Sequence, residues 1–150
     1  MDATLAQDHP KQRLLFFLAQ EFDDGIQGTI RGFVLRLALL RRWLNGAPRF
    51  VDLHEEPEDP SREDQPIDTV GGYIEIYSAY PPWTLPREIE LQHLDEVTAL
   101  VNALCDLSRE HELAFELELD DKFVGSIVFG TMNVTLSVGL LGEWRRVLGV

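Results

Sequence analysis

The stretch that most constrains the fold is 73–119, which has the pattern of a strand, a proline-rich connection, a long amphipathic helix and a second strand. Apolar and polar residues alternate over 73–77 and again over 113–119, the period of a strand with one covered face. Between them, 95–111 carries apolar residues at helical spacing, with Asp95 as the expected N-cap. This order predicts a βαβ-like unit, with a right-handed crossover if its two strands are parallel.

The N-terminal part of the chain predicts two helices. Asp8 followed by Pro10 is a typical helix start, and the apolar residues that follow favour a first helix over about 8–22. Apolar residues recur at helical spacing over 28–44, which predicts a second helix that ends before Pro48.

The remaining segments complete an α+β fold. Four strands are expected, at about 49–53, 73–77, 113–119 and 123–129. The last segment predicts a C-terminal helix over about 133–148, with Thr131 or Asn133 as its cap. The chain is therefore expected to be one domain over 1–150, with N-terminal helices, a four-stranded mixed sheet, one crossover helix and a C-terminal helix.

An acidic, proline-containing segment at about 52–68 lies between the predicted strand at 49–53 and the predicted strand at 73–77. It holds eight acidic residues and three prolines and almost no apolar side chains, which is typical of a loop. Two interpretations are open. The loop is either a solubilising insertion or a flexible acidic arm that engages a basic partner through salt-sensitive association.

The charge of the chain restricts its partners. Its net charge of -13 repels polyanions, so nucleic acid and anionic membrane surfaces are poor candidates and a basic protein is the better one. The apolar run at 33–44 contains Arg36, Arg41 and Arg42, and it is too short and too charged to span a bilayer. The single cysteine, Cys105, excludes an intramolecular disulfide, so we predict a cytoplasmic protein.

A search for catalytic and cofactor motifs identifies none. The four histidines lack the spacings that place two ligands on one metal ion, and there is no glycine-rich phosphate loop. Gly125-Ser126 lacks the glycine pattern of a nucleophile elbow, and the place of Cys105 on an apolar stripe favours a buried hydrophobe over a nucleophile. We therefore predict no catalytic residue, no metal site and no cofactor.

One carboxylate constellation remains, made of Glu75, Glu116 and Glu118 on the polar faces of two predicted strands. If those strands are neighbours, the carboxylates share a face and could serve as acid and base or bind a divalent ion. They could equally form the solvent face of a half-exposed sheet, or an acidic face that docks a basic protein. Tyr80 and Trp83, in the proline-rich connection, would provide aromatic anchors for such a partner.

These observations favour a non-enzymatic protein-binding module, such as an immunity protein or inhibitor that neutralises a basic partner, for example a bacterial toxin. The predicted partner-binding residues lie on the acidic strands and in the proline-rich connection: Glu75, Tyr77, Tyr80, Trp83, Glu116 and Glu118. Two alternatives stay open. One is a carboxylate-dependent or metal-dependent hydrolase that uses the three glutamates, and the other is a structural homodimer that pairs through the basic helix at 29–44 or the helix of Trp144.

Overall fold

A computed structural model of the chain describes residues 9–55, 67–78 and 85–150, and the helices and strands named below belong to those residues. In chain order they are β1 (Lys11–Leu18), α1 (Asp24–Leu40), β2 (Arg49–Glu55), β3 (Ile67–Tyr77), α2 (Arg87–His111), β4 (Ala114–Leu119), β5 (Lys122–Val128), β6 (Thr131–Met132), the π-helical segment η1 (Thr135–Gly142) and α3 (Glu143–Leu148). The chain has the predicted α+β composition.

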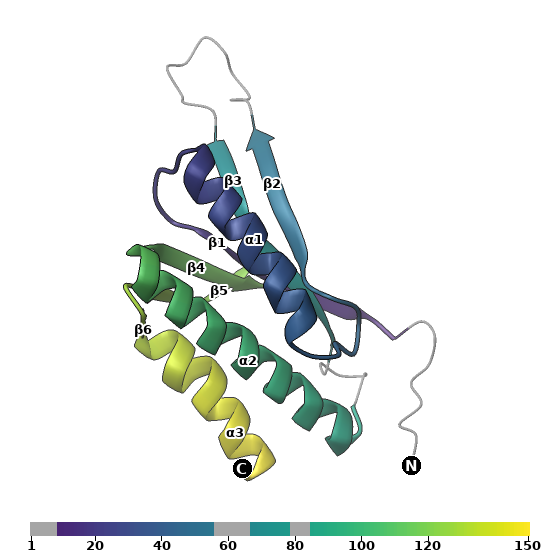
Figure 1. Cartoon of the computed structure of the whole chain (residues 1–150). Coiled ribbons are helices and arrows are strands. Elements are labelled where there is room, and N and C mark those ends of the chain that lie inside the picture. Colours follow the sequence, from purple (N-terminus) through teal and green to yellow (C-terminus); the bar gives the residue numbers. More distant parts are fainter. Residues whose placement is uncertain (1–8, 56–66, 79–84) are drawn as a thin grey trace.

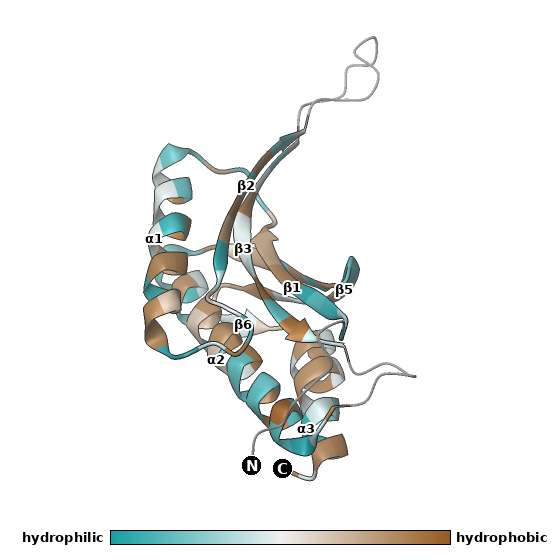
Figure 2. Cartoon of the chain, turned by 90° about the vertical axis from the view of Figure 1, so that its right-hand side faces the viewer, coloured by the Kyte–Doolittle hydropathy of each residue, from teal (hydrophilic) through white to brown (hydrophobic). Residues whose placement is uncertain are grey.

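The strands form a single sheet with the order β2-β3-β1-β4-β5-β6, and every pair of neighbours is antiparallel. The prediction of four strands in a mixed sheet is therefore wrong in both respects. β3 and β4 do run parallel to each other, but β1 lies between them, so α2 joins two strands that are not neighbours. This is a split βαβ arrangement, with α1 and α2 along one face of the sheet (Figures 1 and 2).

The predicted first helix over 8–22 is wrong, because the chain there forms β1, the strand between β3 and β4. Leu14 and Phe16 point into the core, while Leu15 and Phe17 are half-buried on the other face. Because both faces carry apolar side chains, the run shows no alternation, and periodicity cannot distinguish such a strand from a buried helix.

Both long helices begin earlier than predicted. α1 starts at Asp24, because the Asp23 carboxylate accepts a hydrogen bond of 2.9 Å from the backbone N–H of Ile26. α2 starts at Arg87, so the predicted cap Asp95 lies inside the helix and forms an ion pair of 2.6 Å with Arg41. The core lies between these helices, the C-terminal segment and the face of the sheet that they cover, which is called the inner face here.

The C-terminal segment is helical as predicted, but it begins with the π-helical turns of η1 and follows the short strand β6. η1 packs directly on β5 at Gly125. A Cβ atom on Gly125 would lie 2.3 Å from the Cβ atom of Leu136, and the backbone φ of +157° there is one that other residues rarely adopt. Glycine at this position therefore allows the close contact between η1 and the sheet.

Asn133 joins the end of the sheet to the start of the C-terminal helix, which confirms it as a cap. Its Oδ1 atom accepts hydrogen bonds from the backbone N–H of Ser126 at 3.1 Å and of Leu136 at 3.0 Å. Asn133→Ala should lower the free energy of unfolding by about 1–2 kcal/mol, because both donors lose their partner. Urea denaturation measures the change, and Asn133→Asp, which keeps the acceptor, should retain most of the stability.

Candidate functional site

The face of the sheet turned away from α1 and α2 is called the outer face here. Strand register assigns to it Lys11, Arg13, Leu15 and Phe17 of β1, Arg49, Val51 and Leu53 of β2, Tyr73, Glu75 and Tyr77 of β3, Glu116 and Glu118 of β4, and Phe123 of β5. Figure 2 shows α1 and α2 together on the opposite side of the sheet. The outer face is therefore a mixed surface of charged, aromatic and aliphatic side chains.

The structure brings two of the three predicted carboxylates together and separates the third. Glu116 and Glu118 project from β4, whereas Glu75 projects from β3, on the far side of β1. All three share the outer face, but the register places Arg13 opposite Glu75 and Leu15 opposite Glu118. The strand of Glu75 and the strand of Glu116 and Glu118 are thus not neighbours. The predicted joint acid–base or metal site required neighbouring strands, so this condition is not met.

The predicted aromatic residues have different outcomes. Register assigns Tyr77 to the outer face at the end of β3, but its ring centre lies 5.7 Å from that of the buried His93 of α2, so the side chain also packs toward the helical side of the sheet. Tyr80 and Trp83 fall outside the residues that the structure describes. The Nζ atom of Lys11 lies 5.7 Å from the centre of the Tyr77 ring, and the guanidinium carbon of Arg13 lies 4.6 Å from that of Tyr73. These two cations of β1 are therefore engaged by tyrosines of β3 through cation–π contacts.

A cavity of about 400 Å³ opens on the outer face. Aliphatic and aromatic groups of β1, β2 and β3 form one part of its wall: Leu15, Val51, Leu53 and Tyr73. The carboxylates of β4 and of the turn after it form another part: Glu118, Asp120 and Asp121. Thr69, Lys11 and Arg13 complete the lining, so the cavity offers an apolar surface beside an acidic rim.

Sequence reasoning missed several residues of this surface. Leu15 and Phe17 were assigned to a helix, which hid the fact that they reach the same face as the predicted glutamates. Phe123 was assigned to the right strand, but only the register of the hairpin places it opposite Glu118, where 52% of its surface is exposed. Alternation along β5 would put Phe123 on the same face as the buried Ile127, and it is the register shift next to Leu117 that moves Phe123 to the face of Glu118.

Away from the outer face, Cys105 lies in the hydrophobic core. Burial raises the pKa of the Cys105 thiol above its ordinary value, so the thiolate that a nucleophile needs is disfavoured. Among the described residues, no group of three or more His, Cys, Asp or Glu side chains could hold a metal ion.

His93 and Glu96 form a buried pair that connects three segments of the chain. The Nε2 atom of His93 accepts a hydrogen bond of 3.1 Å from the backbone N–H of Tyr77 at the end of β3. Its Nδ1 atom lies 3.4 Å from a carboxylate oxygen of Glu96 without hydrogen-bond geometry. The other oxygen of Glu96 accepts a bond of 2.7 Å from the backbone N–H of Leu44, so the pair links α2 to both α1–β2 and β3.

Two further observations concern membrane-spanning helices and similarity to known proteins. Over the described ranges, no helix has both the length and the apolar character that crossing a membrane requires. No protein-family model matches the chain, and neither a curated protein nor a solved structure gives a match.

Proposed function

We propose that the chain is a non-enzymatic protein-binding module that takes a basic protein partner on its outer face. One observation carries the proposal: the outer face sets large, partly exposed apolar side chains beside carboxylates that have no partner among the described residues. None of Glu116, Glu118 and Glu75 takes part in a side-chain hydrogen bond or ion pair within that part of the chain.

The apolar part of the surface supplies the contact area for such a partner. Leu15, Phe17 and Tyr73 are half-buried in the isolated chain, and Phe123 is more exposed than any of them. Aromatic side chains beside a cavity are typical anchors at protein interfaces, because they bury a large area with few rotatable bonds. Covering these groups would provide the hydrophobic contribution to binding.

The carboxylates select the charge of the partner. Glu116, Glu118, Asp120 and Asp121 form an acidic margin along β4 and its turn, while the cations of β1 are already held over tyrosine rings. With a net charge of -13, the whole chain also steers a basic protein toward this surface. An inhibitor that covers a basic surface of another protein, such as an immunity protein bound to a toxin, fits this combination, and a cytoplasmic location remains part of the proposal.

The test is a charge reversal on β4. Glu116→Lys with Glu118→Lys should slow association with the partner by about tenfold or more at low salt and weaken its salt dependence, because steering and contact charges are both inverted. The partner is first captured from a lysate of the source cells and identified by mass spectrometry. Association and dissociation rates are then measured with the purified partner at several salt concentrations.

The matched control carries the same change of net charge on another part of the surface. Glu21→Lys with Glu88→Lys reverses two exposed carboxylates, one before α1 and one in the first turn of α2. The control should retain most of the association rate, while Phe123→Ser, which removes an apolar contact without changing charge, should mainly speed dissociation. Equal losses in both charge-reversed variants would show that net charge alone is responsible, and would contradict a site on the outer face.

A further inference from the structure

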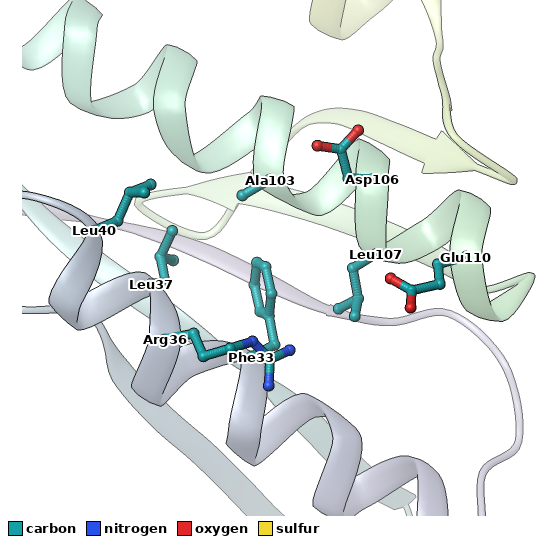
Figure 3. Close-up of a pocket in the computed structure, with 8 residues that line it drawn as sticks. All are labelled: Phe33, Arg36, Leu37, Leu40, Ala103, Asp106, Leu107 and Glu110. Carbon is teal, nitrogen blue, oxygen red and sulfur yellow. The ribbon is translucent and has the colours of Figure 1, made fainter.

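A second surface of the chain lies on the helical side, between α1 and α2, and it is called the helical groove here (Figure 3). Its volume is about 230 Å³. The floor is apolar and comes from both helices: Phe33, Leu37, Leu40, Ala103 and Leu107. Arg36 of α1 lines one side, and Asp106 and Glu110 of α2 line the other, as Figure 3 shows.

Large apolar side chains extend this surface along α1. Leu40, at the end of the groove, is 59% exposed, and Leu39 and Leu35 are 87% and 64% exposed. α1 thus buries one apolar stripe in its own core and presents further leucines to solvent, whereas a helix that only covers a sheet normally presents polar residues there. The leucines and the groove together form an apolar surface without a partner among the described residues.

The charges around the groove identify which partner fits. Arg36 takes part in no ion pair with the described residues, while Asp106 is bonded to Arg109 at 3.3 Å and Glu110 lies 4.0 Å from His111. A basic partner would meet Arg36, and an acidic partner would meet the two carboxylates. A second copy, related by a two-fold axis, would place the Arg36 of each chain against the carboxylates of the other.

We propose that the chain forms a symmetric homodimer through the helical groove and the exposed leucines of α1. The interface lies on the opposite side of the sheet from the outer face, so each copy keeps its proposed partner site free. The net charge of -13 makes two copies repel each other at a distance. Because salt screens exposed charges beyond about 10 Å at 0.1 M, the dimer should be weakest at low ionic strength.

The test uses charge exchange across the two-fold axis. Sedimentation velocity at protein concentrations up to about 0.3 mM should show a species of twice the 17.1 kDa chain mass. Arg36→Glu alone, and Asp106→Arg with Glu110→Arg alone, should each sediment as monomers, because like charges then face each other. An equimolar mixture of the two variants should recover the dimer, since each remaining contact again joins opposite charges.

Two controls distinguish dimerisation through this interface from association through another apolar surface, and loss of the dimer from misfolding. Val147→Glu introduces a charge at another exposed apolar position, on α3, and should leave the dimer intact. Circular dichroism checks that each variant stays folded, and recovery on mixing excludes misfolding as the reason for a monomer. A wild-type chain that stays monomeric over the whole concentration range, or a mixture that fails to recover the dimer, would overturn the proposal.

Discussion

Gly71→Ala is expected to lower the free energy of unfolding by about 3 kcal/mol, although the change adds a single methyl group. Gly71 lies in the middle of β3, paired with Phe17 of β1 and with Val51 of β2. A Cβ atom there would lie 1.9 Å from the carbonyl oxygen of Phe16 and 2.8 Å from its carbonyl carbon. Both are backbone atoms of the central strand, so they cannot move aside without shifting the ladder between β1 and β3.

A second glycine provides the matched control for this measurement. A Cβ atom on Gly28, in α1, would meet no atom within 4 Å, and glycine is an unfavourable residue inside a helix. Gly28→Ala should therefore raise the free energy of unfolding by up to about 1 kcal/mol. Urea denaturation of the two variants should give changes of opposite sign. A Gly71→Ala protein as stable as the wild type would show that β1 and β3 do not approach so closely.

Glu96→Ala is the second change with a large expected effect, a loss of about 3 kcal/mol in the free energy of unfolding. The Glu96 carboxylate is buried, accepts the backbone N–H of Leu44 and lies beside His93. Alanine would leave that donor without an acceptor and would open a cavity beside the imidazole. Because the pair links α2 to the segment before β2, the loss should also loosen that connection.

The neighbouring residue supplies the comparison for Glu96. Asp95 also has a charged partner, Arg41, but its side chain is 70% exposed. Asp95→Ala should therefore change the free energy of unfolding by less than about 1 kcal/mol. Glu96→Gln keeps an acceptor for Leu44 and should fall between the two. Thermal and urea unfolding of the three variants would test this order, and equal losses at 95 and 96 would contradict a structural role for the buried pair.

The sequence predicts the elements with clear periodicity and fails where periodicity is absent. The alternation over 113–119 and the helical stripe over 95–111 both correspond to observed elements, as does the hairpin from β4 to β5. β1 was missed because a strand between two others, apolar on both faces, has the composition of a buried helix. Its omission removed the strand between β3 and β4, which explains the wrong strand count and the incorrect expectation of a mixed sheet.

The same omission limits what the sequence can say about the candidate site. The sides of their own strands on which Glu75, Glu116 and Glu118 lie follow from alternation, and the structure places all three on the outer face although β3 and β4 are not neighbours. Their separation does not follow, because it depends on which strand lies between β3 and β4. Lys11 and Arg13 could not be assigned to this face while the segment was taken as a helix. Strand order is a long-range property, and local pattern does not encode it.

The central place of β1 also has a consequence for how the chain folds. β1 is the first strand, yet its hydrogen-bonded partners lie at 71–77 on one side and 115–119 on the other. Neither ladder can form until distant parts of the chain have come together, and closing such long loops is the slow step in folding. Until then the apolar run of β1 has two unpaired edges. Refolding should therefore take milliseconds to seconds, and aggregation during refolding should compete most strongly at high protein concentration.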